Sequence, residues 1–500
     1  MAETARSHDG RDNPAVWDET SRAWVKAAKD FFIPSLDFSH HKGQNGRICV
    51  VGGALEFTGA PYFSAMAALH MGMDLAYIIT TPEAAGPIKT YSPELIVYPI
   101  LPGESQRGQS LEDALARLES KASAILKKCD VIVMGPGMGS PAVPPAPDAG
   151  SDKDRDLRET RGMTPETGCA VQRAALTVLN MAMEENKFLV IDADMIRVLC
   201  APSHSPSLQR LKNYRQCILT PNKREIDLLL RAFHHLTESS PPPHGSFLSS
   251  FFAAAHREQQ RSLGAQTASG VSSDISEQRK SAAETQAAPT ASEDSASALT
   301  APPSLLPLPL FPSSFMPFAP TLAGLPLGLE GPSLLVKGAA DVLVVFSRAP
   351  SRPGYSSPDS GGAAFAACGL SRASRGSPKR SGGQGDVLGG VLAAFIAWWR
   401  IALANRRGSP GVVSVHPGSA EGNVKKNPEE TDHEARRDTS LGPVIGVDDE
   451  EAAGLLCAAF NACLLVRQTA ARAFQEHGRS MLAGHLLARI GPVFRTLYNE

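Results

Sequence analysis

The sequence predicts an α/β fold in which a mostly parallel central β-sheet lies between two layers of helices. Short runs rich in Val, Ile and Leu alternate with longer segments of helical pattern along most of the chain. Most of these runs are continuously apolar rather than alternating, which is typical of parallel strands that are buried on both faces. Repeated strand-then-helix order with short turns favours such a layered fold.

Eight segments are expected to form strands. They are Arg47–Val51, Ala76–Thr80, Leu95–Ile100, Val131–Met134, Phe188–Ile191, Cys217–Leu219, Ser333–Val336 and Val342–Phe346. A helix is expected to start after Ser110, because Asp113 follows three residues later and the pair resembles a capping box before an amphipathic stretch. The apolar stretch Val387–Trp399 is too short to span a bilayer and predicts a buried core helix.

Composition excludes several classes of protein. The chain has 500 residues, and its 49 Lys and Arg nearly balance 51 Asp and Glu, for a net charge of −2. A dedicated nucleic-acid binder usually carries a basic surplus, so nucleic acid is not an expected partner. With 42% hydrophobic residues the chain can bury a large core. The first twenty residues lack the apolar segment of a signal peptide, and no membrane partner is expected.

Domain organisation follows from two kinds of sequence, segments with an α/β pattern and stretches of low complexity. The length alone suggests two to four domains of about 150 residues each. However, the α/β pattern continues across stretches rich in Ser, Pro and Ala, which cannot bury enough surface to fold. We therefore expect an N-terminal tail, 1–24, followed by a single catalytic domain, 25–500. Disordered insertions are expected near 141–165, 238–332, 350–375 and 406–446.

The sharpest chemical feature is Ser381-Gly-Gly-Gln-Gly-Asp386, which directly precedes the apolar helix. Glycines let the backbone approach an anion closely, and a helix N-terminus offers free N–H groups to phosphate. Asp386 is then a candidate general base that takes a proton from a hydroxyl beside the phosphate. On spacing alone, an N-capping Asp after a flexible turn is an equally good interpretation.

Four other predicted strands end in glycines or polar residues. The motifs are Met134-Gly-Pro-Gly-Met-Gly139, Asp192-Ala-Asp194, Thr220-Pro-Asn222 and Lys337-Gly338. Ligands commonly bind at the carboxyl edge of a parallel sheet. There the paired acids can hold Mg²⁺ or orient water, and the Lys can place a cation near phosphate. Plain tight turns and helix caps are the alternative interpretations of the glycine motif and of the Asp and Asn motifs.

Together these segments resemble a known family, the ATP-dependent (S)-NAD(P)H-hydrate dehydratases, which have a ribokinase-like fold. The resemblance covers nearly all of the chain outside the insertions, in the family's order. It rests on His41-Lys-Gly-Gln-Asn-Gly-Arg47, Val50-Val-Gly-Gly53, Phe57-Thr-Gly-Ala-Pro-Tyr-Phe63, Lys89-Thr-Tyr-Ser-Pro-Glu-Leu95, Gly135-Pro-Gly-Met-Gly139, Ile191-Asp-Ala-Asp194, Leu219-Thr-Pro-Asn222, Val336-Lys-Gly338, Gly382-Gly-Gln-Gly-Asp386 and Phe474-Gln-Glu-His-Gly-Arg-Ser480. The Thr-Gly-Ala-Pro-Tyr and His-Gly-Arg-Ser stretches make it specific to this family.

The resemblance implies a repair reaction on hydrated NADH and NADPH (NADHX and NADPHX). ATP, with Mg²⁺ as cofactor, phosphorylates the hydroxyl of the nicotinamide ring, and loss of phosphate restores NADH or NADPH. The implied general base is Asp386, which also contacts the substrate. The other implied substrate contacts are Gly137, Gly139, Asn222, Lys223, Arg224, Glu225, Ile226, Asp227 and Leu228. The metal ligands are not assigned.

The resemblance also implies the ATP contacts. They are Lys337, Gly338, Ala339, Ala340, Asp341, Gly376, Ser377, Pro378, Lys379, Arg380, Ser381, Gly382, Gly383, Gln384 and Gly385. Ala339 and Ala340 stand where the family usually carries charged residues, which leaves them backbone hydrogen bonds to ATP. The residues do not distinguish ATP from ADP as donor, and resemblance to eukaryotic members favours ATP.

Two other functions fit the sequence. One is a ribokinase-like small-molecule kinase that keeps its phosphorylated product, and the other is a non-catalytic nucleotide-binding scaffold. The resemblance further implies functional pairing with an NAD(P)HX epimerase and leaves a homo-oligomer open. The eight cysteines include no CxxC pair, which favours a reducing compartment. We expect a cytoplasmic location, with a mitochondrial one as the alternative.

Overall fold

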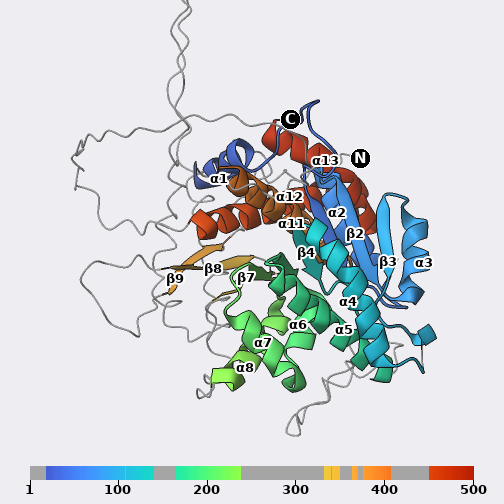
Figure 1. Cartoon of the computed structure of the whole chain (residues 1–500). Coiled ribbons are helices and arrows are strands. Elements are labelled where there is room, and N and C mark those ends of the chain that lie inside the picture. The colour runs from blue at the N-terminus through green and yellow to red at the C-terminus, as the bar shows by residue number, and fades with distance from the viewer. Residues whose placement is uncertain are drawn as a thin grey trace, which may run out of the picture. The chain divides into compact units, whose positions relative to one another are not determined.

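The computed structural model describes residues 19–106, 108–139, 165–237, 331–338, 341–348, 363–369, 376–406 and 450–499 (Figure 1). All of them belong to one compact unit, residues 1–242 and 310–500. A second unit, 243–309, lies outside the described residues. The predicted insertions at 141–165, 238–332 and 406–446 also lie almost entirely outside them, so the single catalytic domain over 25–500 stays a prediction.

The described strands form one nine-stranded sheet in the order β3-β2-β1-β4-β5-β6-β7-β8-β9. The pairs from β3 to β7 are parallel, whereas β8 and β9 run antiparallel to their neighbours. The strands are β1 (Arg47–Val51), β2 (Leu75–Thr80), β3 (Leu95–Pro99), β4 (Val131–Met134), β5 (Phe188–Ile191), β6 (Cys217–Leu219), β7 (Ser333–Val336), β8 (Val342–Arg348) and β9 (Ala363–Gly369).

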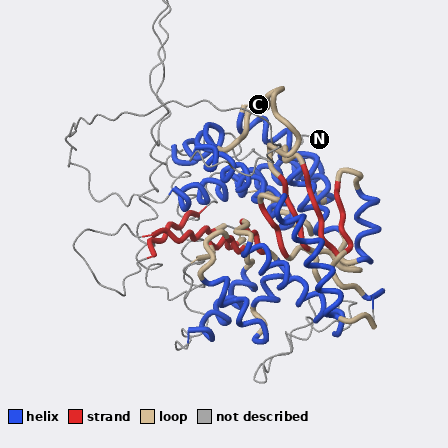
Figure 2. Tube along the Cα trace, viewed as in Figure 1, coloured by secondary structure: helices blue, strands red, loops and turns tan. Residues whose placement is uncertain are grey.

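Helices cover both faces of this sheet (Figure 2). On one face α11 packs against α2 and α12, and α13 against both α2 and α12. On the other face α4 packs against α5, and α8 against α6 and α7. The α-helices are α1 (Glu19–Phe31), α2 (Gly59–Met71), α3 (Pro82–Tyr91), α4 (Leu111–Lys128), α5 (Pro165–Glu184), α6 (Ala193–Leu199), α7 (Ser205–Lys212), α8 (Lys223–Thr237), α11 (Gln384–Arg406), α12 (Glu450–His477) and α13 (Ala483–Tyr498). Short 3₁₀ turns are η3 (Glu104–Gln106), η5 (Pro202–His204) and η7 (Gly478–Ser480).

The predicted α/β class with a mostly parallel central sheet and helices on both faces is therefore confirmed. All eight predicted strands are present, with ends shifted by at most two residues. The predicted start of α4 is confirmed as well, because the Ser110 hydroxyl accepts a hydrogen bond of 3.4 Å from the Asp113 amide.

Three boundaries were wrong. Strand β9 lies inside the predicted insertion at 350–375; its Ala-rich sequence carries little β-propensity and is ordered by pairing with β8. Helix α1 begins at Glu19, within the predicted tail 1–24, because Trp24 is buried and stacks on Phe460 of α12. Helix α11 is 23 residues long and extends beyond the predicted 387–399 segment.

Helices α11 and α12 form the centre of one helical layer. Both are long and apolar enough to cross a membrane by composition, but 72% and 94% of their most apolar windows are buried inside the protein. Gly390 explains the close contact of α11 with α2, since a Cβ there would lie 2.0 Å from the Ser64 carbonyl oxygen. This packing holds the N-terminus of α11 against the sheet, where the candidate site lies.

Candidate active site

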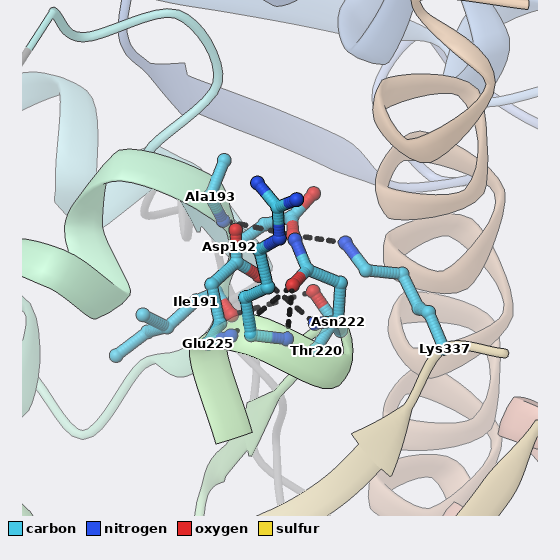
Figure 3. Close-up of polar contacts among 8 residues, drawn as sticks. Ile191, Asp192, Ala193, Thr220, Asn222, Glu225 and Lys337 are labelled. Carbon is cyan, nitrogen blue, oxygen red and sulfur yellow. Dashed lines mark hydrogen bonds and ion pairs between the residues drawn. The ribbon is translucent and has the colours of Figure 1, made fainter. Parts of the chain in front are cut away.

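The carboxyl edge of the parallel sheet gathers the polar residues that follow four of its strands. Asp192 follows β5, Asn222 follows β6 and Lys337 follows β7, and the last two form a parallel bridge. The glycine motif that ends at Gly139 follows β4. Figure 3 shows Asp192, Asn222 and Lys337 lying side by side. The motifs that follow these strands thus lie together at one edge of the sheet.

Asp192 and Lys337 form a buried ion pair. The Lys337 Nζ lies 2.5 Å from Asp192 Oδ1, and the Asp192 side chain is 3% exposed. Burial opposes the charge on Lys337, but Asp192, Glu225 and Asp386 outweigh it and hold the pKa of Lys337 above its ordinary value. Asp192 Oδ1 also accepts a 2.8 Å hydrogen bond from the amide of Ala193 at the start of α6. Asp192 thus serves both as helix cap and as partner of the cation.

Asp386 stands in the first turn of α11, close to that ion pair. Burial and the negative charges of Asp192 and Asp194 raise the pKa of Asp386 to about 7, while Lys337 opposes the shift. Lys337 reaches the same turn, because its Nζ lies 3.7 Å from the position that a Cβ on Gly385 would take. A carboxyl group that titrates near neutral pH is suited to accept and release a proton at working pH.

The loop before α11 is shaped for an anion. Gly383 has φ +87°, and a Cβ there would lie 2.8 Å from the Ala483 Cβ and 2.9 Å from the Phe63 ring. Because no side chain fits at Gly383, the backbone amides of this loop stay accessible to an anion at the N-terminus of α11. The hydroxyl oxygen of Ser381 is buried and has no hydrogen-bond partner in the described part of the chain. An unsatisfied donor next to a helix N-terminus fits a phosphate oxygen.

Hydrogen bonds from two arginines connect the predicted ATP segments 337–341 and 376–385 with each other and with α12. Arg467 of α12 donates from Nε and Nη2 to Asp341 Oδ2, at 2.8 and 2.7 Å, and from Nη2 to the Gly338 carbonyl at 3.2 Å. Arg380 Nη2 donates to the same carbonyl at 3.3 Å. The Asp341 carboxylate in turn accepts the Gly338 amide at 3.0 Å. Ala339 and Ala340, between them, lie outside the described residues.

Further contacts order the second segment. The Ser377 hydroxyl accepts a 3.0 Å hydrogen bond from the Lys379 amide, and Lys379 Nζ donates to the carbonyl of Arg479 in η7. Gly376 has φ +71° and lies against Arg467. The His-Gly-Arg-Ser stretch is therefore part of the frame that holds the predicted ATP loop.

The predicted substrate residues divide into two groups. Gly139 donates its amide to Asp194 Oδ2 at 3.0 Å, and Gly137, with φ +62°, approaches the Phe57 carbonyl. Asn222 caps α8, because its Oδ1 accepts the amides of Arg224 and Glu225 at 2.9 and 3.1 Å. The Glu225 carboxylate accepts the Asn222 amide at 2.9 Å, which completes a reciprocal cap.

The helical segment after Asn222 cannot present every predicted residue to one ligand, because consecutive helix residues point in different directions. Lys223, Arg224, Asp227 and Leu228 are exposed, whereas Glu225 is buried and Ile226 lies in the core, 2% exposed. Burial raises the pKa of Glu225. The contacts of residues 222–228 with a substrate stay a prediction.

An aromatic cluster beside the site was not predicted as functional. Tyr62 packs edge-to-face against both Phe63 and Tyr91, with ring centroids 5.4 and 5.3 Å apart. The Tyr91 hydroxyl and the Thr58 hydroxyl lie 2.7 Å apart. The Phe63 ring faces Gly383 of the anion loop, so the cluster borders the site. Its signal in the sequence was the Thr-Gly-Ala-Pro-Tyr-Phe motif at the start of α2.

Comparisons with known proteins agree with this geometry. A family model described as NAD(P)H-hydrate dehydratase matches residues 48–149. The ATP-dependent (S)-NAD(P)H-hydrate dehydratase of Emericella nidulans is 29% identical over 96% of this chain and 95% of its own length. The enzyme of the same name from Batrachochytrium dendrobatidis is 27% identical over 95% of this chain and 99% of its own length. That from Bos taurus is 26% identical over 93% and 87%.

Among solved structures, the ADP/ATP-dependent NAD(P)H-hydrate dehydratase from Bacillus subtilis aligns with 95% of this chain and 97% of its own, at 13% identity and a TM-score of 0.41. The nine-stranded sheet, the helices on both of its faces and the glycine loop before a core helix define a three-layer α/β protein. The chain is similar to the ATP-dependent (S)-NAD(P)H-hydrate dehydratases over 93–96% of its length, and a model of the NAD(P)H-hydrate dehydratases matches residues 48–149.

Proposed function

We propose that this protein is an ATP-dependent dehydratase that returns the S-form of NADHX and NADPHX to NADH and NADPH, with Asp386 as its general base. The observation that carries the proposal is the position of Asp386. Its carboxyl group has a pKa raised to about 7 and stands at the start of α11, beside Lys337 and the glycine loop. Asp386 is the proton acceptor, Lys337 is the cation, and the glycine loop supplies backbone amides for an anion beside them.

The chemistry follows from these groups. Hydroxide is a poor leaving group, whereas phosphate is a good one. Ionised Asp386 takes the proton of the ring hydroxyl while the hydroxyl oxygen attacks the γ-phosphorus, and ADP leaves. Loss of phosphate with a ring proton then restores the double bond. Lys337 and the amides of 382–385 stabilise negative charge on the transferring phosphoryl group, which is the main demand of such a reaction.

Magnesium is the proposed cofactor. Among the described residues, no three His, Cys, Asp or Glu side chains lie close enough to hold a metal ion. Mg²⁺ is usually bound by one or two carboxylates together with substrate phosphates and water, so the donor set fits a metal carried in with ATP. Asp192 and Asp194, whose charges act on Asp386, are the carboxylates that we propose to face the metal. Bound Mg²⁺ supplies charge neutralisation to the phosphates.

The test is to incubate the full chain with ATP, Mg²⁺ and NADHX and follow absorbance at about 340 nm, the band of the reduced nicotinamide. We expect recovery of the band with one ADP and one phosphate per turnover. A parallel reaction with ADP measures the donor preference. Formation of ADP with a stable phosphorylated product and no recovery would instead identify a kinase. An Asp386→Asn variant that retains full turnover contradicts the general-base role.

The remaining attributes are proposals that rest on the resemblance. We propose action beside an NAD(P)HX epimerase, which would supply the S-form, and a cytoplasmic location. A homo-oligomer is the proposed state and is tested by light scattering on the full chain.

A further inference from the structure

A cavity lies at the opposite edge of the sheet from Asp386. Its volume is about 480 Å³, and it is lined by residues at the amino ends of β5, β6 and β7 and by the facing ends of α11 and α12. Pockets that bind small molecules usually measure about 300–1,000 Å³, so the volume of this cavity suits such a ligand. The distance along α11 from Asp386 to Arg400, fourteen residues, is about 21 Å at 1.5 Å per residue. The cavity is therefore separate from the proposed phosphoryl-transfer site.

Arg400 is the charged group that distinguishes this cavity. Its guanidinium lies over the Phe188 ring, 5.7 Å from the centroid, and its Nη1 donates to Gln216 Oε1. Gln216 is held in turn by a 2.8 Å hydrogen bond from its Nε2 to Asn186 Oδ1. A guanidinium has five N–H donors. Within the described residues, Arg400 has this one hydrogen-bond acceptor and no carboxylate at ion-pair distance.

The Arg400 side chain is half-buried. Burial lowers the pKa of Arg400, and interactions with Tyr214, Asp130 and Glu451 oppose that shift. Charged groups that are withdrawn from water are normally paired or hydrogen-bonded. Arg400 lines the cavity. An anion bound in the cavity would supply the acceptor and the counter-charge that the described residues do not give to this side chain.

Other lining groups favour a negatively charged ligand. Among the described residues that line the cavity, Arg215 is a second positively charged side chain and Glu451 is the single carboxylate. The Phe188 and Trp399 rings, which pack edge-to-face with centroids 6.4 Å apart, supply apolar wall. The planar fork of a guanidinium matches the two oxygens of a carboxylate or phosphate.

We propose that this cavity binds a small metabolite through a phosphate or carboxylate group, which the guanidinium of Arg400 holds. The site is distinct from the active site, because it lies at the opposite ends of β5, β6 and β7 and at the other end of α11. The inference does not depend on the reaction that Asp386 catalyses.

The test is a titration of the full chain with pyrophosphate and, separately, with citrate. A saturating non-hydrolysable ATP analogue is present, so that the loop before α11 is occupied. Binding is followed by tryptophan fluorescence, since Trp399 lines the cavity, and by thermal unfolding. The two anions distinguish a phosphate ligand from a carboxylate ligand. We expect saturable binding of at least one of them and, in Arg400→Gln, an affinity at least about tenfold weaker, as for loss of a charge-assisted hydrogen bond.

The matched control is Arg210→Gln. Arg210 is an exposed arginine that pairs with Asn180 and Glu184 outside the cavity, so its loss should leave anion binding unchanged. Equal weakening in both variants, or no saturable binding to the wild type, overturns the proposal. If Arg400→Gln does not fold, crystals of the wild type soaked in tungstate decide. Anomalous density within hydrogen-bond distance of the Arg400 guanidinium supports the site, and density only elsewhere refutes it.

Discussion

Lys337 and Asp192 lie 145 residues apart in the chain, yet their charged atoms meet at 2.5 Å beside the first turn of α11. The pairing follows from the sheet order, since β5 and β7 flank β6 and all three end at the same edge. In the absence of phosphate, Asp192 balances the charge of Lys337. It also sets the electrostatic environment of Asp386, because Asp192 raises the pKa of that carboxyl while Lys337 lowers it.

The first prediction concerns the pH dependence of turnover. A general base acts in its ionised form, and the pKa of Asp386 is about 7. We expect kcat to rise with pH and to level off above about pH 7. The rise should follow one ionisation, measured as NADH recovery at saturating ATP between pH 5 and 9. A flat profile across this range contradicts the assignment of Asp386 as base.

The same pKa predicts an effect on stability. The pKa of Asp386 is higher in the folded chain than its ordinary value of 3.8. Its contribution to stability is therefore complete below about pH 4 and is lost as the pH rises through about 7. Asp386→Asn should lack this loss, so the variant should gain stability relative to wild type between pH 4 and 8. Urea unfolding at both values measures the difference, and equal pH profiles for the two proteins exclude the effect.

The two partners of the ion pair should have opposite effects on the pKa that the pH profile of kcat reports for Asp386. Asp192→Asn removes a negative charge, so the pKa of Asp386 should fall and the acid limb of kcat should move to lower pH. Lys337→Met removes a positive charge, so the limb should move upward, and the KM for ATP should rise. Lys127→Met, an exposed lysine 3.7 Å from Glu185, is the control and should move neither. Shifts of the same sign in the two site variants would falsify this model of the site.

Gly383 and Gly382 provide a matched pair of substitutions in the anion loop. A Cβ on Gly383 meets both Ala483 and Phe63 and needs a strained φ of +87°, whereas a Cβ on Gly382 meets nothing within 4 Å. Gly383→Ala should therefore cost about 1–3 kcal/mol of unfolding free energy and raise the KM for ATP. Gly382→Ala should leave both near wild type. Chemical denaturation and initial rates measure them, and equal behaviour of the two variants counts against the loop geometry.

Sequence reasoning predicted the parallel strands whose carboxyl edge carries the candidate site. Continuous apolar runs such as Val131–Met134 and Phe188–Ile191 are buried on both faces, so their composition alone predicted parallel strands. Strand β9 was not predicted, because Ala363–Gly369 has neither β-branched residues nor an alternating pattern. Its structure depends on pairing with β8, which is a tertiary interaction.

The partners of individual side chains could not be predicted. Asp192 fitted a helix cap and a metal ligand equally well, and only the register of β5, β6 and β7 shows that it also pairs with Lys337. Arg467 gave no signal, since it lies within the largely apolar helix α12 and its partner, Asp341, is 126 residues away. Such choices depend on three-dimensional proximity, which spacing along the chain does not encode.

Arg467 leads to the last prediction, because it holds the predicted ATP segment at 338–341 through a planar fork. Arg467→Lys keeps the charge but loses the planar guanidinium that bonds Asp341 through two nitrogens and also reaches the Gly338 carbonyl. We expect the KM for ATP to rise about tenfold with little change in the KM for the hydrate, and a loss of about 1–3 kcal/mol of stability. Arg472→Lys, on the same helix but 64% exposed and paired with Glu476, is the control and should stay within about 0.5 kcal/mol. Isothermal titration with ATP and urea unfolding measure the two effects. An unchanged affinity for ATP in Arg467→Lys, with stability lowered as expected, would show that the fork supports the fold and not the nucleotide site.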